Sequence, residues 1–380
     1  MYKKTGISII LTLVMFASLM AQGGHSHTIK DNKTFVRGGF GEIHLHRDLD
    51  KGKDKALNLE IPHFAMRLGY VFNDKWHFFG KLALEHGHEI HLENLYLNYE
   101  VSHELNIKGG LITLPVGIVN QEHLPTTYNG VTPPQLYRYI IPMEWCELGF
   151  GVNGEHHESH IAYQAYLVNG LVSYHDGGGL FDGFTGFRSG RQSGHDVRSA
   201  LPSFAGRIEW HGIKNGVLGA SLYAGKSQSD AYSRLSSAAA DSTVIGLVML
   251  GADARLSFGG LQFRGEVMYN RLSNVSAYNS YTNTDIGQSM LGWYGELAYK
   301  YTPRARQFAV QPFVRYARYD THLSVPQNTK RNGSYANNTL TCGLGFFINN
   351  HVMLKTDYQH QKYDDGYRNN TLNGGVSFVW

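Results

Sequence analysis

The chain has 380 residues, of which 44 are glycine, 24 tyrosine and 19 phenylalanine. Apolar residues make up 42% and the formal net charge is only +3, so nothing indicates a basic surface for nucleic acid. Glycine and aromatic residues in these numbers are unusual for a soluble α/β enzyme. They are typical of a membrane-spanning sheet, whose outer face needs apolar cover and aromatic girdles at both interfaces.

Residues 1–21 have the pattern of a secretory signal peptide. The basic pair Lys3-Lys4 precedes an apolar run over 7–20, and the small residue Ala21 follows that run. The run is shorter than the roughly 20 residues that a helix needs to cross a bilayer. We therefore expect an exported chain in which residues 22–380 form a single β-barrel domain.

Segments in which apolar and polar residues alternate recur along the mature chain, as expected of strands between lipid and a lumen. Sixteen candidates lie at 34–46, 62–72, 75–86, 91–101, 104–114, 146–156, 159–168, 203–211, 215–225, 244–258, 260–271, 290–301, 306–319, 338–349, 351–362 and 371–380. Pro312 falls inside one of them, and because proline cannot donate to a ladder we expect a bulge or a shifted register there. The predicted fold class is all-β, a transmembrane antiparallel β-barrel of about 16 strands.

The connections between these segments alternate in length. Every second connection is a tight turn of residues that supply positive φ or preset φ: Asn73-Asp74, Ser102-His103, His157-Glu158, Lys214-Asn215-Gly216, Gly259-Gly260, Thr302-Pro303-Arg304 and Asn349-Asn350. Most of the others are long, near 47–61, 115–145, 169–202, 226–243, 272–289, 320–337 and 363–370, and only 87–90 is short. This alternation indicates a Gram-negative outer-membrane barrel with short periplasmic turns and long extracellular loops.

The last predicted strand keeps its alternation to the final residue. Leu372, Val376, Phe378 and Trp380 share one face. An aromatic ending resembles the signal by which outer-membrane barrels are recognised for assembly. We therefore expect the barrel assembly machinery to be a partner through Trp380, and outer-membrane lipid and lipopolysaccharide to surround the wall.

Three motifs between residues 93 and 154 resemble a known family. They are Glu93-Asn94-Leu95-Tyr96-Leu97, the run from Gly110 to Gly117, and the run from Ile141 to Gly149 that is followed by Gly154. In order and spacing they are similar to the phosphate-selective porins O and P. The resemblance implies a sixteen-stranded homotrimeric porin whose third long loop, here near 115–145, folds into the lumen. That loop carries Glu122, His123, Tyr137, Arg138, Tyr139 and Glu144.

Strand parity assigns equal numbers of bases and acids to the lumen. The bases are Arg37, Arg67, Lys81, Lys108, Arg207, Arg255, Arg264, Lys300, Arg315 and Lys355. The acids are Glu42, Glu85, Glu100, Glu147, Glu155, Glu209, Asp253, Glu266, Glu296 and Asp357. Ten therefore face ten, and the wall has no overall preference for one sign of charge. The predicted constriction and pore lining consists of Glu122, Tyr137, Arg138, Glu144, Arg67, Lys108, Arg207, Arg264 and Arg315. A local anion preference could come from Arg188, Arg191 and Arg198 in loop 169–202.

Twenty histidines raise the question of metal binding, since neutral imidazole suits zinc, copper and nickel. Six are expected near the extracellular rim: His44, His46, His63, His86, His88 and His91. Parity turns the first three to the lumen and the last three to lipid. The competing explanation is that these histidines are amphipathic side chains at the membrane interface and bind no metal.

The sequence predicts a porin through which small hydrophilic solutes or ions diffuse, without a cofactor. One alternative is an anion-selective (phosphate-selective) or divalent-metal channel, and another is a structural or adhesion barrel whose loops bind a partner. Neither G-x-S-x-G nor H-E-x-x-H occurs in the sequence. We therefore do not expect an enzyme.

Overall fold

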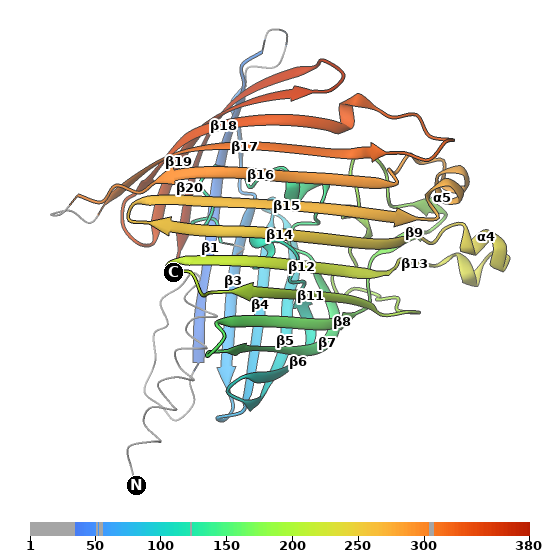
Figure 1. Cartoon of the computed structure of the whole chain (residues 1–380), viewed down its shortest axis with the longest axis horizontal. Helices are drawn as coiled ribbons and strands as arrows, with labels where there is room; N and C mark the ends of the chain where they lie inside the picture. The colour runs from blue at the N-terminus through green and yellow to red at the C-terminus, as the bar shows by residue number, and fades with distance from the viewer. Residues whose placement is uncertain (1–34, 51, 53–55, 122–123, 304–307) are drawn as a thin grey trace.

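The computed structural model describes residues 35–50, 52, 56–121, 124–303 and 308–380, and the predicted signal peptide lies outside them. Within these residues sixteen long strands form one antiparallel sheet, which closes because β1 pairs with both β3 and β20 (Figure 1). The barrel strands are β1 (Phe35–Asp48), β3 (His63–Val71), β4 (Trp76–Glu85), β5 (Glu89–Ser102), β6 (Leu105–Thr113), β7 (Cys146–His156), β8 (Ile161–Val168), β11 (Ser203–Trp210), β12 (Gly216–Lys226), β14 (Gly246–Phe258), β15 (Leu261–Ser273), β16 (Ser289–Tyr299), β17 (Ala309–Ser324), β18 (Ala336–Phe347), β19 (Val352–Tyr363) and β20 (Arg368–Val379). The predicted fold class is confirmed.

The alternation along each strand separates an apolar outer face from a polar inner one. On β3, the side chains of Met66 and Leu68 are each 48% exposed, whereas that of Ala65, the residue before Met66, is fully buried. Leu95 and Leu97 of β5 are exposed in the same way, and the intervening Tyr96 turns inward. An exposed apolar belt of this kind suits contact with lipid tails.

The long connections gather at one end of the barrel. They carry β2 (Asn58–Glu60), β9 (Val172–His175), β10 (Gly178–Gly179), β13 (Gln228–Ser229), α4 (Ser237–Asp241), α5 (Val275–Thr282), η1 (Arg188–Gly190), η2 (Ala231–Ser233) and η3 (Gly333–Tyr335). β2 lengthens the β1 edge, and β9, β10 and β13 form a small separate sheet. α4, α5 and the small sheet lie together beyond the strand ends in Figure 1. None of the described helices is long and apolar enough to cross a bilayer.

The last residue closes the seam beside β1. The backbones of Gly39 and Trp380 exchange two hydrogen bonds of 3.0 Å, and the indole stacks on Phe64 at 5.4 Å. A Cβ at Gly39 would lie 2.3 Å from the Trp380 ring, so only glycine leaves room for the indole there.

Pro312 does not cause the predicted bulge or register shift. β17 pairs with β16 at Phe313–Ala298, is interrupted at Pro312, and pairs again at Val310–Tyr301. Between these two pairs each strand advances by three residues, so the register of β17 against β16 is the same on both sides of Pro312. The missing N–H removes one rung of the ladder without moving the strand.

Parity assigned two side chains to the wrong face. Arg37 pairs with the exposed Leu68 and is itself exposed, so it lies on the outer face and not in the lumen. His91 pairs with the buried Ala83 and so shares its inner face, although parity sent it to lipid. The cause for His91 is a bulge in β5 at Glu93, which reverses the alternation on the extracellular side of that residue. No register shift occurs along β1, where Arg37 is an odd number of positions from the inward Glu42, so the alternation itself places Arg37 outside.

Candidate pore constriction

The connection between β6 and β7, residues 114–145, is held together by one buried asparagine. It contains two short helices, α2 (Ile118–Gln121) and α3 (Leu136–Tyr139). The Asn120 amide donates to the carbonyl oxygens of Val116 (3.1 Å) and Pro142 (3.0 Å), and its Oδ1 accepts the Glu144 N–H at 2.9 Å. Because these bonds join the beginning of the loop to its end, loop 114–145 is a closed unit.

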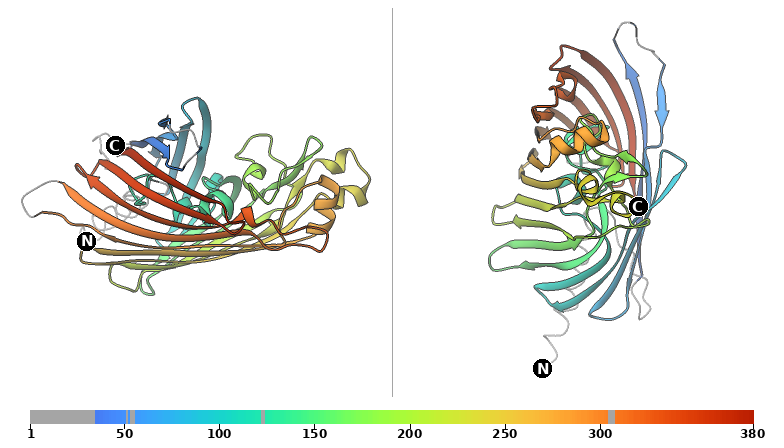
Figure 2. Two further views of the ribbon diagram at one scale, coloured as in Figure 1. Left: turned by 90° about the horizontal axis from the view of Figure 1, so that it is seen from above. Right: turned by 90° about the vertical axis from the view of Figure 1, so that its right-hand side faces the viewer.

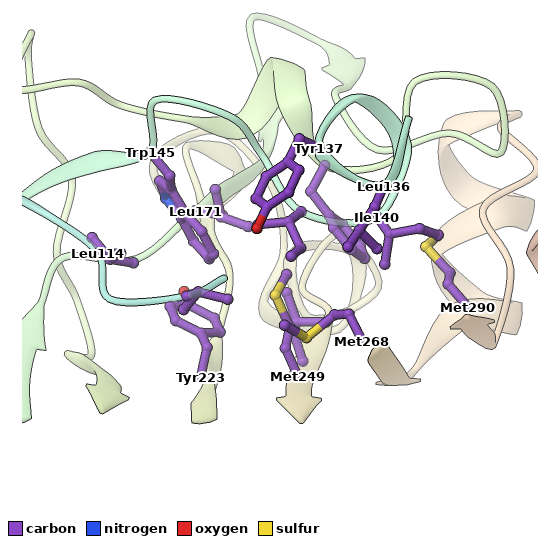
Figure 3. Packing of buried hydrophobic residues seen from close by; sticks show 14 of the residues in the cluster. Leu114, Leu136, Tyr137, Ile140, Trp145, Leu171, Tyr223, Met249, Met268 and Met290 are labelled. Carbon is purple, nitrogen blue, oxygen red and sulfur yellow. The ribbon is translucent and has the colours of Figure 1, made fainter. Parts of the chain in front are cut away.

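An apolar side of loop 114–145 packs against an apolar part of the inner wall (Figure 3). Leu136 of α3 and Ile140, which follows that helix, lie near Met290, and Tyr137 lies above Met249 and Met268. Trp145 is fully buried, with its ring centre 4.7 Å from that of Tyr223 on β12. Burial of this many large side chains favours one fixed position of the loop.

The middle of loop 114–145 is hydrogen-bonded to strands that lie four or more places around the sheet from β6 and β7, and Figure 2 (right) shows the loop segments inside the ring of strands. The contacts are Tyr128 Oη to Glu42 of β1 (2.8 Å), Asn129 Nδ2 to Glu296 of β16 (2.7 Å), the Val131 N–H to Asp357 of β19 (2.6 Å), Arg315 of β17 to the Thr132 carbonyl (3.2 Å) and Lys355 of β19 to the Gly130 carbonyl (3.0 Å). Since the loop starts and ends on β6 and β7, these contacts carry it across the lumen.

A second anchor is made by one tyrosine of α3. The Tyr137 hydroxyl accepts the Val119 N–H at 2.8 Å and donates to Glu266 of β15. Burial and the Glu266 carboxylate raise the pKa of Tyr137 well above its ordinary value. The hydroxyl therefore keeps the proton that it donates.

A third anchor joins the end of the loop to β3 and β5. The His63 ring lies between two carboxylates, with Nδ1 2.8 Å from Glu144 and Nε2 2.8 Å from Glu93, and Lys81 pairs with Glu93. Glu144 has a left-handed backbone, with φ of +56°. Such a conformation costs a non-glycine residue about 1–3 kcal/mol, and the bond to His63 helps to offset that cost.

Three of the four predicted lining residues of the loop lie within the described residues, and they have different surroundings. Tyr137 and Glu144 are anchors to the wall. Arg138 is exposed, with its guanidinium 5.4 Å from the centre of the Tyr139 ring. Glu122, like His123, falls outside the described residues.

Two of the predicted wall bases are neutralised by acids. Arg207 lies 2.8 Å from Asp253 and 2.9 Å from Glu209, and Arg315 lies 2.7 Å from Glu296. Both guanidinium groups are almost fully buried. These pairs fix the position of the wall and of loop 114–145, and their charges offset one another.

The other three predicted bases have aromatic or partly open surroundings. The Lys108 amine is buried 4.7 Å from the centre of the Tyr96 ring, and the Arg67 guanidinium is 5.2 Å from that of Phe40. Arg264 is half-buried on the inner face of β15. The predicted bases therefore do not form one ring around the lumen.

A group of arginines that strand parity did not place together forms beside the loop. Partial burial, and then the positive charges of Arg191 and Arg138, lower the pKa of Arg188. Glu144 and Glu85 act on the same residue in the opposite sense. Arginine and glutamate charges of opposite sign therefore act on Arg188 together. The sequence named Arg188 and Arg191, but only the fold adds Arg138 to them.

The six rim histidines do not form one cluster. His44 and His46 come together with Glu60, His63 lies with Glu93 and Glu144, and His91 lies with Glu85 and Glu89. His86 and His88 belong to none of the metal-ligand groups formed by the described residues.

These features define the class of protein. A closed antiparallel barrel of sixteen strands, with short turns at one end, long loops at the other and a loop hydrogen-bonded across the lumen, has the fold of outer-membrane porins. Residues 200–379, which are 180 of the 380, match the family model described as outer membrane protein beta-barrel domain. This match supports an outer-membrane location.

Solved structures of similar fold are outer-membrane channels and porins. The outer membrane channel DcaP of Acinetobacter baumannii has a TM-score of 0.62 and 11% identity, over 93% of this chain and 99% of its own. OmpF of Salmonella typhi, solved in complex with daunomycin, has a TM-score of 0.57 at 8% identity, over 93% and 99%. OprB of Pseudomonas putida also reaches 0.57, at 10% identity over 96% of both chains.

One curated relative is similar over most of the chain. It is a protein of Aquifex aeolicus (strain VF5) described as an uncharacterized protein, 28% identical over 358 residues that cover 90% of this chain and 79% of the relative. The narrower resemblance to phosphate-selective porins rests on residues 93–154, outside the matched 200–379. It therefore stays a prediction.

Proposed function

We propose that the protein is an outer-membrane porin through which small hydrophilic solutes or ions diffuse, and that loop 114–145 forms its constriction. The observation that carries the proposal is the set of hydrogen bonds from Tyr128, Asn129 and Val131 to β1, β16 and β19, none of which is adjacent to β6 or β7. A loop held across a lumen narrows it, and the charged groups beside the loop set a field across the path. The fold shared with known channels supports the proposal, which involves no catalytic step.

Conductance of the purified protein in planar bilayers tests the proposal. Arg138→Cys, made with Cys342→Ser, places an accessible thiol on the loop, because the remaining Cys146 is buried and Cys342 is the exposed thiol. We expect stepwise currents that scale with salt and fall when a charged thiol reagent is added. Lys214→Cys in a short turn is the matched control and should keep its current. A folded protein without conductance contradicts the proposal, and equal block of both variants contradicts the role of the loop.

A preference for anions is the second candidate, and the grouping of Arg138, Arg188 and Arg191 favours it. The reversal potential in a salt gradient distinguishes a weakly selective pore from an anion channel. Replacement of Arg188 by glutamine should shift that potential towards cations.

A homotrimer is part of the main proposal. It is supported by a porin-fold neighbour, OmpT of Vibrio cholerae, solved in a trimer form, and native mass spectrometry tests it.

A further inference from the structure

Two histidines and one glutamate meet where β2 pairs with the extracellular end of β1. His44 and His46 are two residues apart on the inner face of β1, and Glu60 of β2 lies directly opposite His44 in the ladder. His46 Nε2 is 3.4 Å from a Glu60 oxygen, and one ligand atom from each of the three residues falls within 4.8 Å of the others. The His44 side chain is 5% exposed, that of His46 28% and that of Glu60 45%. An ion can therefore approach from the extracellular side.

The surroundings of His46 leave its Nε2 free to act as a ligand. The ring Nδ1 is 2.8 Å from Asn373 Oδ1, while the amide nitrogen of Asn373 donates to Asp357 at 2.7 Å. An ionised carboxylate only accepts hydrogen bonds, so the amide nitrogen must face Asp357 and the amide oxygen must face His46. Nδ1 then carries the proton. The lone pair lies on Nε2, which points to Glu60.

The surroundings of His44 fix the opposite tautomer. Its Nε2 is 3.0 Å from Glu42 Oε2, which also accepts the Tyr128 hydroxyl at 2.8 Å. Since the carboxylate accepts, His44 Nε2 carries the proton and Nδ1 has the lone pair. Metal-binding histidines commonly donate their second ring N–H to a carboxylate or carbonyl oxygen, which orients the ring and increases its basicity. Both histidines have such a partner here.

We propose that His44, His46 and Glu60 bind a divalent first-row transition-metal ion at the extracellular mouth. Two neutral imidazoles and one carboxylate, with water in the remaining position, suit Zn²⁺, Co²⁺ or Ni²⁺ better than the oxygen-seeking Ca²⁺ or Mg²⁺. Ligand atoms at about 2.0–2.1 Å from a tetrahedral ion stand about 3.4 Å apart. Ligand atoms that now lie within 4.8 Å of one another would have to approach by about 1.4 Å at most, and the exposed Glu60 side chain can make much of that adjustment. The site is independent of whether the barrel conducts.

The other three histidine and carboxylate groups of the described residues suit a metal less well: Glu85, Glu89 and His91 offer a single imidazole, and the other two groups lie beside a positive charge. Each His63 nitrogen already lies 2.8 Å from a carboxylate, and the Lys81 amine pairs with one of those acids. His175 lies beside Asp230, which is 3.3 Å from the Arg234 guanidinium. A fixed positive charge at each of these places opposes a metal cation.

Zn²⁺ titration of the folded full-length protein by calorimetry at neutral pH tests the proposal. Other histidines add weak sites, so the readout is one equivalent of tight binding. His46→Gln and Glu60→Gln should each weaken that binding about tenfold or more. The matched control replaces His157 and Glu155, a pair 3.6 Å apart that belongs to none of the metal-ligand groups of the described residues, by glutamine and should bind as the wild type does.

Two further measurements keep the outcome decisive. Circular dichroism confirms that each variant is folded, and Glu60 is exposed, so its replacement leaves the barrel intact. Visible absorption of bound Co²⁺ should show nitrogen ligation in the wild type and lose it in His46→Gln. Absence of a tight equivalent, or equal binding by Glu60→Gln, His46→Gln and the control, would overturn the proposal.

Discussion

Tyr137 of loop 114–145 donates a hydrogen bond to Glu266 of β15, and the same hydroxyl accepts the N–H of Val119. One oxygen atom thus joins both helical turns of the loop to the barrel wall. The two residues are 129 positions apart in the sequence. Their contact exists only because the sheet closes around the loop.

Tyr137→Phe should loosen the loop. The change leaves the Val119 N–H without its partner and removes one donor from the buried Glu266 carboxylate, at a cost of about 1–3 kcal/mol. We expect larger and noisier single-channel currents in planar bilayers. Tyr301→Phe, at an exposed tyrosine, is the control. Traces identical to the wild type would show that the hydroxyl does not hold the loop.

Gly117→Ala should destabilise the same anchor by a different route. Gly117 has φ of +83°, and a Cβ there would lie 2.7 Å from Glu266 Oε1 and 2.8 Å from the Tyr137 hydroxyl. Both the backbone conformation and the space exclude alanine. We expect the heat-induced loss of the folded, SDS-resistant band to occur several degrees lower. Gly295→Ala meets no atom within 4 Å and should behave as the wild type.

The Arg315–Glu296 pair should show strong coupling. Arg315→Met leaves the buried Glu296 charge without its cation, which typically costs about 3–5 kcal/mol. The double change to Arg315→Met and Glu296→Met removes both charges and should cost much less. Urea unfolding of the four proteins of this cycle measures the coupling free energy. Equal destabilisation by the single and the double change would contradict it.

The extracellular loop 325–335 should loosen in acid. Asp364, in the turn after β19, accepts hydrogen bonds from Arg318 (3.0 Å) and Arg331 (3.3 Å), and these hold its pKa below the ordinary value of 3.8. A carboxyl with a lowered folded pKa stabilises the fold above its unfolded pKa, and this contribution is lost as pH falls through the folded pKa.

A spin label at Lys330→Cys, made with Cys342→Ser, reports the mobility of this loop. We expect mobility to increase as pH falls through the lowered pKa of Asp364, below the ordinary range of an aspartate. In Asp364→Asn the label should be mobile at higher pH, because the ion pairs are missing throughout. A label whose mobility does not depend on pH in either protein would contradict the assignment.

The sequence was sufficient for features that repeat locally. The pleat of a strand gives a period of two, so sixteen segments and their inner and outer faces could be recognised without knowledge of their neighbours. It failed where one residue changes the phase. The bulge at Glu93 turns His91 inward. The error at Arg37 has no such cause, because β1 alternates without a break between Arg37 and the inward Glu42.

The constriction could be predicted in outline and not in its contacts. The length and polarity of the third loop, with the family resemblance, indicated a segment inside the lumen that carries Tyr137, Arg138 and Glu144. Nothing in the spacing identified Asn120 as the residue that joins the two ends of loop 114–145, or His63 as the partner of Glu144. Such pairs depend on which wall positions face one another after closure, and closure is set by strand tilt and stagger.

The sequence by itself determined the alternating pattern, the strand number and the short and long connections, because each is a local property; with Arg37 on the outer face, the ten lumen-facing bases it predicted become nine against ten acids. Only the tertiary structure decided that Tyr137 reaches Glu266, that Arg207 and Arg315 are neutralised, and that His44, His46 and Glu60 meet while His86 and His88 stay apart. The physical reason is that closing the barrel brings residues far apart in the chain to the same level of one lumen. Their side chains then pair according to distance and hydrogen-bonding capacity, which no sequence interval records.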